Sequence, residues 1–333
     1  MYSTTMNIGL SKPVLLLCLA EETVVYWDLM SATRAGMAAS RLSIAKAKAP
    51  LPLTNGGRLD LTFIGTGSAF SKKFYQNNLL VVKKSGHLLV DCGSRAPEAL
   101  SELGLSVGQI RNYLITHTHA DHIGGLEEVM LVGRYGLSRK STMVATDKLA
   151  KALWSMSLRG GASFNEEKKD GSYLGFDDFW DRIKPKPLRG AGRELCEATV
   201  DGIEVRLFRT KHIPDTSPDW ASSFISYGVI LDRRILFTSD TRYDPGMVEG
   251  LDAEYGFEAI FHDCQLFTGG VHASLDEIAS LPAAIRSKTR LMHYGDKIEE
   301  ALPKIAKLGF AGIVEQWKTY SFPASEASDG QAK

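Results

Sequence analysis

The segment His117–His122, with the sequence HTHADH, places four side chains that commonly bind metal ions within six residues. It follows an apolar segment that ends at Ile115, and a glycine pair comes soon after it. His117 and His119 are two positions apart, so in an extended chain both rings lie on the same side. Three histidines and one aspartate, without a nearby thiolate, suit zinc, manganese or iron used for hydrolysis. A polar loop whose histidines only cap backbone groups is the alternative, and the dense spacing disfavours it.

Three further candidate ligands, His212, Asp240 and His293, each follow or end a predicted strand. Any one of them alone is more often an ordinary loop residue than a ligand. Together they predict one cleft, because side chains at the ends of several strands can converge. Asp240 can bridge two cations, since a carboxylate has two oxygens.

The apolar pattern predicts an α/β protein whose organised part spans residues 58–320, with sheets covered by helices. The predicted helices cover residues 97–105, 276–285 and 297–308, and a further helix begins at residue 125. The predicted strands cover residues 59–64, 79–83, 87–90, 109–115, 203–209, 223–231, 235–238, 259–262 and 290–293.

The composition is that of a soluble globular protein, with 44% hydrophobic and 23% charged residues among 333. The formal net charge is zero, which gives no support for a general nucleic-acid or membrane partner. The four cysteines are scattered and form no CxxC pair, so neither a disulfide framework nor a zinc–thiolate site is expected. A reducing cytoplasm is the expected location.

The two ends of the chain are predicted to lie outside the organised part. Residues 1–57 form an N-terminal extension of uncertain structure, with an accessory helix expected around residues 31–48. Its apolar run at residues 14–20 is too short to span a bilayer. The polar residues 321–333 are expected to form a disordered tail.

The HxHxDH motif, together with an aspartate at Asp240, resembles the metallo-β-lactamase superfamily, and more closely its ribonuclease-Z-like phosphodiesterase branch. Many true β-lactamases of this superfamily have cysteine at the position of Asp240. The resemblance covers most of residues 58–320 and implies a four-layer αββα sandwich with a dinuclear site at one edge. Two divalent ions are implied, with zinc expected and manganese the alternative. The implied ligands are His117, His119 and His212 for one ion, Asp121, His122 and His293 for the other, and Asp240 as the bridge.

Two further elements support this branch. Phe261–Cys264 resembles its HEAT motif with Asp263 in place of glutamate, and Val271–Ser274 resembles the His-Ser/Thr element that follows. Hydrolysis of a phosphodiester needs a proton for the leaving oxygen, and His272 is the candidate general acid. A loop histidine with a structural hydrogen bond is the alternative for His272.

The remaining acidic residues and histidines also have expected positions. Asp121 is predicted to steer the proton of the attacking water as well as to bind metal, and Asp263 to orient His272. Asp91 is predicted to orient a metal-bound histidine. His262 is expected to be structural, and His87 exposed.

The position of the long insertion bears on the substrate. Long-form transfer-RNA processing enzymes carry an arm between the third histidine motif and the bridging aspartate, whereas residues 213–239, 27 in all, already hold two predicted strands here. RNA is therefore disfavoured. The insertion instead covers residues 133–195 and carries Trp154, Tyr173, Phe176, Phe179 and Trp180. These aromatics are expected mostly to pack against a second subunit, and stacking on a base is the alternative.

The segments Gly65–Phe70, Phe261–His272 and Met292–Asp296, with the histidine cluster, are similar to the anti-Pycsar phosphodiesterases. That resemblance implies hydrolysis of pyrimidine and purine cyclic mononucleotides by a homodimer, with residues 160–187 as the dimer and lid element. Other classes remain open. One is an RNA-processing nuclease of the same branch, and another is a lactonase, β-lactamase or arylsulfatase-like hydrolase. A non-catalytic metal sensor is disfavoured by the complete set of candidate ligands.

Overall fold

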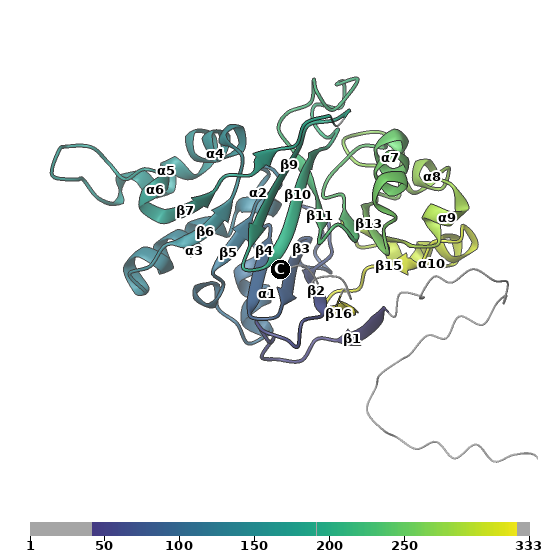
Figure 1. Ribbon diagram of the computed structural model, residues 1–333, viewed down its shortest axis with the longest axis horizontal. Helices are drawn as coiled ribbons and strands as arrows, with labels where there is room; N and C mark the ends of the chain where they lie inside the picture. The colour runs from purple at the N-terminus through teal and green to yellow at the C-terminus, as the bar shows by residue number, and fades with distance from the viewer. Residues whose placement is uncertain (1–41, 191, 325–333) are drawn as a thin grey trace, which may run out of the picture.

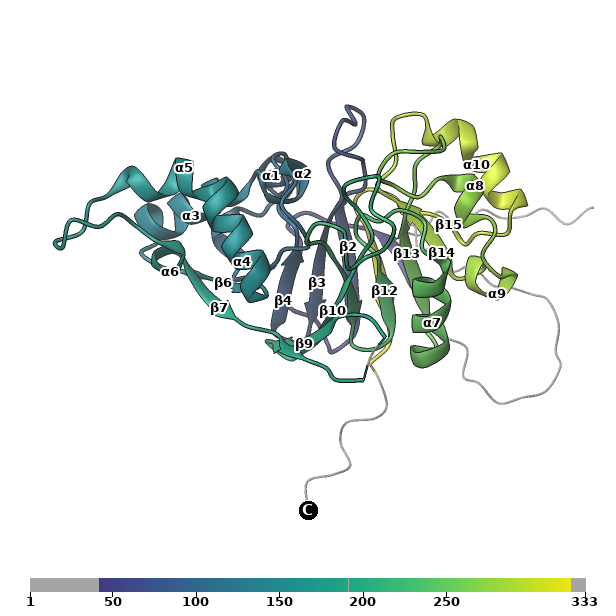
Figure 2. The same ribbon diagram turned by 90° about the horizontal axis from the view of Figure 1, so that it is seen from above.

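The computed structural model describes residues 42–190 and 192–324. Two eight-stranded sheets face one another in it, and helices cover both outer sides (Figures 1 and 2). This arrangement confirms the predicted αββα sandwich.

The first sheet has the strand order β1-β16-β2-β3-β4-β5-β6-β7. Its central strands read as continuous apolar runs because both of their faces are covered. The strands are β1 (Ser43–Lys46), β2 (Leu59–Gly65), β3 (Asn78–Lys83), β4 (Gly86–Val90), β5 (Asn112–Leu114), β6 (Ser141–Val144), β7 (Trp180–Ile183) and β16 (Lys318–Phe322).

The second sheet has the order β15-β14-β13-β12-β11-β10-β9-β8, in which β12 to β15 run parallel and the other pairs are antiparallel. Its strands are β8 (Lys186–Pro187), β9 (Leu195–Val200), β10 (Ile203–Arg209), β11 (Tyr227–Leu231), β12 (Ile235–Phe237), β13 (Ala259–Asp263), β14 (Thr289–Met292) and β15 (Gly312–Ile313).

The helices fall into two sets, on the left and on the right of Figure 2. The left set accompanies the first sheet: α1 (Ala96–Glu102), α2 (Ala120–Ile123), α3 (Leu126–Leu131), α4 (Asp147–Leu153), α5 (Arg159–Ala162) and α6 (Phe176–Phe179). The right set accompanies the second sheet: α7 (Pro245–Tyr255), α8 (Leu275–Ile278), α9 (Ala283–Arg286) and α10 (Ile298–Lys307). No helix in residues 42–190 or 192–324 is long and apolar enough to cross a bilayer.

Aromatic side chains from both sheets meet in the core between them. The ring of Phe63 lies 5.1 Å from that of Phe261 and 6.3 Å from that of Phe237, measured between centroids. The ring of Tyr320 in β16 packs against the same aromatic group, with its centroid 5.8 Å from that of Phe63. All four rings are fully buried, so the two sheets are joined by a tightly packed aromatic layer.

The predicted ends of the organised domain are wrong by several residues. Residues 43–46, which the sequence assigned to a helix in the extension, form β1 and pair antiparallel with β16. The predicted tail is also set too early, because Ser321 and Phe322 belong to β16 and Phe322 is fully buried. The rest of the predicted helix up to residue 41, and residues 325–333, lie outside the described residues.

Several predicted elements differ in length for identifiable reasons. The strand expected from residue 223 begins only at Tyr227, because the Arg209 guanidinium binds the carbonyl oxygens of Trp220, Ser223 and Phe224 and holds them in a loop. The helix expected at residues 276–285 is divided into α8 and α9, since Pro282 has no N–H group to continue it.

His87 is buried rather than exposed, and its Nε2 accepts a hydrogen bond from the Arg111 amide.

The insertion at residues 133–195 contributes to the sandwich itself, because it contains β6, β7 and β8. Four of its aromatics, Trp154, Phe176, Phe179 and Trp180, contact one another at centroid distances of 6.1–6.5 Å. The expectation that they pack against a second subunit is therefore wrong for Phe179 and Trp180, which are buried within this chain. For the half-buried Trp154 and Phe176 it stays a prediction. Tyr173 is different, since it lies half exposed against Phe164 near the projecting loop between α5 and α6 (Figure 1).

Gly228 is required by close packing in β11. A Cβ added at this position would lie 2.1 Å from the ring of Phe208, which is fully buried in β10. We expect Gly228→Ala to lower the free energy of unfolding by about 1–3 kcal/mol through overpacking. Gly250→Ala in α7 is the matched control, because a Cβ there meets nothing within 4 Å. It should stabilise the helix by about 0.5–1 kcal/mol. Urea unfolding measures both, and equal effects would contradict this account.

Candidate metal centre

All seven predicted ligands lie together at one edge of the sandwich. His117 and His119 follow β5, while Asp121 and His122 lie in α2. The other three come from the second sheet: His212 follows β10, Asp240 follows β12 and His293 follows β14. Their ligand atoms form two groups that share Asp240, namely His117, His119, His212 and Asp240, and Asp121, His122, Asp240 and His293.

Glycines bring the histidine segment close to β4. The Cys92 amide donates to the carbonyl of His122, and the Gly125 amide donates to the carbonyl of Cys92. A Cβ at Gly93 would lie 2.1 Å from the carbonyl oxygen of Asp121. Gly125 meets the same restriction, because a Cβ there would lie 2.7 Å from the Gly93 carbonyl oxygen.

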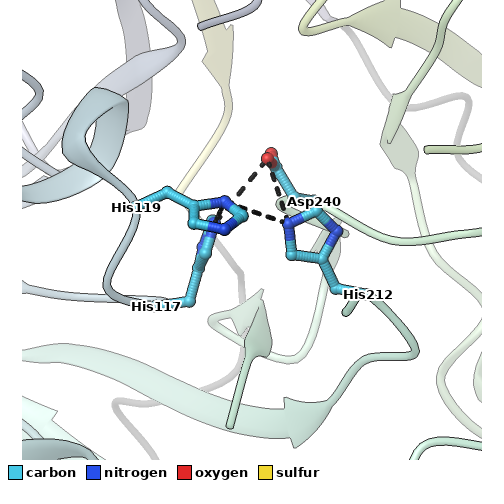
Figure 3. A group of neighbouring side chains, drawn as sticks. All are labelled: His117, His119, His212 and Asp240. Atoms are coloured by element: carbon cyan, nitrogen blue, oxygen red, sulfur yellow. Dashed lines mark hydrogen bonds and ion pairs between the residues drawn. The ribbon is translucent and has the colours of Figure 1, made fainter. Parts of the chain in front are cut away.

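In the first group the rings from the two sheets point toward one another (Figure 3). His119 Nδ1 lies 3.0 Å from His117 Nε2 and 3.2 Å from His212 Nε2. Asp240 Oδ2 lies 3.8 Å from the Nε2 atoms of His117 and His212. Neighbouring ligand atoms on a tetrahedral zinc ion are about 3.3 Å apart. The spacing and the nitrogen and oxygen donors therefore fit a divalent cation.

The second group has a more even spacing. Asp121 Oδ2 lies 3.3 Å from His122 Nε2 and 3.3 Å from His293 Nε2. Asp240 Oδ2 lies 3.3 Å and 3.4 Å from the same two nitrogens. Within the described chain, His122 Nε2 and both oxygens of Asp240 are buried without a hydrogen-bond partner. Buried polar atoms left in this way fit a ligand role.

The opposite ring nitrogens of the histidines are held by protein groups. His122 Nδ1 lies 2.6 Å from Asp91 Oδ2, and His212 Nδ1 lies 2.9 Å from the carbonyl oxygen of Val271. His293 Nδ1 lies 3.3 Å from Asp263 Oδ1, an ion-pair contact without a hydrogen bond. The hydrogen bonds to Nδ1 of His122 and His212 fix the tautomer and leave the other nitrogen free to bind a metal. The predicted contact of Asp91 with a candidate metal-binding histidine is thus present in the structure.

Two groups that support the candidate ligands were not predicted from the sequence. Thr116 donates to Asp91 from both its amide and its hydroxyl, at 2.8 Å each. Its position next to His117 is a signal that could have identified it. The Val271 carbonyl gives no such signal, because any residue supplies a carbonyl oxygen.

Burial and charge distinguish the two groups. Burial lowers the pKa of His117 and His119, and lowers the pKa of His212 to about 4, so these rings are neutral near pH 7. Burial opposes the charged forms of His122 and His293 too, but Asp240 and Asp121 outweigh it and raise their pKa. Neutral rings leave the lone pairs of the first group free for a metal.

His272 lies beside the second group. Its Nδ1 is 2.7 Å from Asp263 Oδ2, which is the predicted contact. Asp263 also contacts His293 through its other oxygen and accepts a bond from the Thr241 amide at 2.9 Å. The sequence prediction missed the contact between Asp263 and His293. His262 is fully buried, with its Nδ1 2.7 Å from the Asp263 carbonyl oxygen.

Comparison with known proteins identifies the family. The family model described as "Anti-Pycsar protein Apyc1" matches residues 59–320. The chain belongs to the anti-Pycsar Apyc1 family. This Apyc1 family member is 40% identical over 263 residues to an anti-Pycsar protein from Bacillus phage vB_BsuM-Goe3, covering 75% of this chain and 95% of the relative. It is 39% identical over 271 residues to one from Paenibacillus xerothermodurans, covering 79% and 98%.

Solved structures independently support the fold. The metallo-β-lactamase fold protein YhfI from Bacillus subtilis aligns with a TM-score of 0.56 at 15% identity, over 79% of this chain and 99% of that one. A diphosphatase of the PhnP family aligns with a TM-score of 0.54 at 15% identity, over 80% and 98%. The Apyc1 family member therefore has the metallo-β-lactamase fold, as the sequence predicts.

Asp240 gives the most direct test of the metal site, because its Oδ2 lies in both groups. We expect Asp240→Asn to reduce bound metal at both positions, since the amide removes a negative charge from a fully buried carboxylate. Elemental analysis of the purified variant measures the metal content, and circular dichroism checks the fold. Asp60→Asn is the control, because Asp60 is a buried aspartate on β2 outside both groups. A folded Asp240→Asn protein with two ions per chain would refute the shared role.

Proposed function

We propose that this protein is a dinuclear-metal phosphodiesterase that hydrolyses 3′,5′-cyclic mononucleotides to nucleoside monophosphates. It would act in the cytoplasm and counteract cyclic-nucleotide anti-phage signalling. The observation that carries this proposal is the pair of four-ligand groups sharing Asp240, in a chain of the anti-Pycsar Apyc1 family. Two divalent ions held there, most simply zinc, would supply Lewis acidity that activates water and stabilises charge on the phosphoryl oxygens.

The protein's own groups supply the remaining chemistry. Asp121 has one oxygen facing His122 and His293, and we assign it the additional role of steering the proton of the attacking water. His272 is partly exposed and lies beside Asp240, with 3.9 Å between its Nδ1 and Asp240 Oδ2. We assign it the role of giving a proton to the leaving oxygen. Asp263 accepts a hydrogen bond from His272 Nδ1, which leaves the proton on Nε2 for the leaving oxygen.

The charge on His272 suits an acid. Burial opposes protonation, but the Asp263 carboxylate outweighs it and raises the pKa of His272 above its ordinary value. A raised pKa keeps the ring protonated to higher pH, and the proton is lost as the pH rises through that value. Asp263 thus both orients the ring and maintains its proton.

The homodimer belongs to the same proposal. Tyr173 and Phe164 pack together, with ring centroids 4.9 Å apart, and both remain 45–59% exposed. We assign this pair, near the projecting loop, as the surface that meets a second copy and covers its active site.

Turnover assays test the proposed reaction. The zinc- or manganese-loaded protein should open cyclic CMP, UMP, AMP and GMP to monophosphates, and His119→Ala should abolish this. A transfer-RNA precursor and a generic aryl diester are run in parallel. Cleavage of the RNA alone would favour the ribonuclease-Z-like alternative. Cleavage of the aryl diester alone would support a metallo-hydrolase with another biological substrate, and either result would overturn the assignment to cyclic nucleotides.

A second prediction concerns His272. We expect His272→Gln to lower kcat for cyclic nucleotides by about 10²–10⁴, because the leaving alkoxide then lacks an acid. The loss should be much smaller for a diester with a p-nitrophenolate leaving group, which needs no proton. Metal content should remain that of the wild-type protein. An equal loss on both substrates would assign His272 a structural role instead.

A further inference from the structure

Two phenylalanines stand out among the exposed side chains, because each lies on a loop that is hydrogen-bonded to a segment carrying candidate ligands. Phe70 is 86% exposed and Phe267 is 67% exposed. We propose that these two side chains form the contact surface for the nucleobase of the substrate. This inference rests on the proposed function and adds to it the residues that contact the base.

Phe70 lies on a turn that is fixed to the strand end carrying His293. The Ser68 amide donates to the Tyr294 carbonyl at 2.9 Å. The carboxylate of Asp296 accepts bonds from the Ser71 hydroxyl and from the amides of Lys72 and Lys73. The turn therefore has a rigid base directly beside a metal ligand. In Figure 2 the segment between β2 and β3 rises above the edge of the sandwich.

Phe267 lies on a second loop that is tied to the same centre. The loop starts after Asp263, and its ends are joined by a 2.8 Å bond from the Gln265 amide to the Ala273 carbonyl. The Gln265 side chain binds the Gly269 carbonyl within the loop. Near its end the Val271 carbonyl accepts the bond from His212 described above. Phe267 is thus carried by a closed loop that contacts both groups of ligands.

The two loops depart from neighbouring points. His272, near the end of the second loop, and His293, next to the anchor of the first, have ring centroids 4.7 Å apart. Both rings contact the carboxylate of Asp263. A phosphoryl group at the metal centre would therefore lie at the foot of both loops, and the attached nucleoside would extend along them.

The chemistry of the two side chains fits a base rather than a phosphate or a sugar. Phenylalanine offers no hydrogen bond, so it contacts a base only through its ring face, which every purine and pyrimidine can match. Hydrogen bonds already fix the segments from which the two loops project. Little further conformational entropy is therefore lost when the rings contact a ligand. Such a surface would accept all four bases with modest preference among them.

The test compares substrates with and without a base. For Phe70→Ala and Phe267→Ala we expect kcat/KM on cyclic AMP and cyclic CMP to fall roughly 5- to 150-fold, mainly through KM. Hydrolysis of an abasic ribose 3′,5′-cyclic phosphate should be unchanged, and Phe→Trp variants should retain activity on the nucleotides. Leu302→Ala is the control, since Leu302 is an exposed apolar residue on α10 and should have no effect.

A binding measurement separates this inference from the proposed reaction. The fluorescence of a 2-aminopurine cyclic phosphorothioate should be quenched by the wild-type protein and not by the double variant Phe70→Ala, Phe267→Ala. Equal losses of kcat/KM on the abasic and nucleotide substrates, or unchanged quenching, would overturn the role in base contact. If the wild-type protein hydrolyses no cyclic nucleotide, the proposed reaction fails, and the quenching experiment alone decides on the two phenylalanines.

Discussion

The buried carboxylate of Asp240 is the constraint on which the rest of the site depends. Both oxygens lie in the interior, and one of them faces histidines from both sheets. An isolated charge in such a position costs several kcal/mol, so the surrounding groups must compensate it. Histidine rings from both sheets, at 3.3–3.8 Å from this one oxygen, provide the compensation.

The convergence of the candidate ligands could be predicted from sequence because their spacing follows the geometry of single elements. His117 and His119 lie two positions apart after β5, and His212, Asp240 and His293 each follow an apolar strand, so local patterns are sufficient to suggest them. The link from Asp263 to His293 could not be predicted, since it depends on how β13 and β14 pair within the sheet. Sequence shows which residues end a strand, but not which pairs of them touch.

The errors at the edges of the fold have a related cause. β1 has a mostly exposed, mixed sequence, and it becomes a strand only because β16 offers an edge to pair with. The insertion's aromatics are predicted to pack against a partner subunit. Phe179 and Trp180 are instead buried within their own chain, in contact with Trp154 and Phe176. In both cases tertiary contacts, rather than local preference, decide the structure.

The path of the chain implies that a metal ion bound at this centre would also hold the two sheets together. Residues 59–183 build β2–β7 of the first sheet, and residues 186–313 build the whole second sheet. Each candidate ion takes two ligands from each half, so a bound cation would cross-link two halves of one polypeptide. Cation affinity and the cohesion of the sandwich are then linked quantities, because an ion that binds only the assembled halves adds its binding energy to their association.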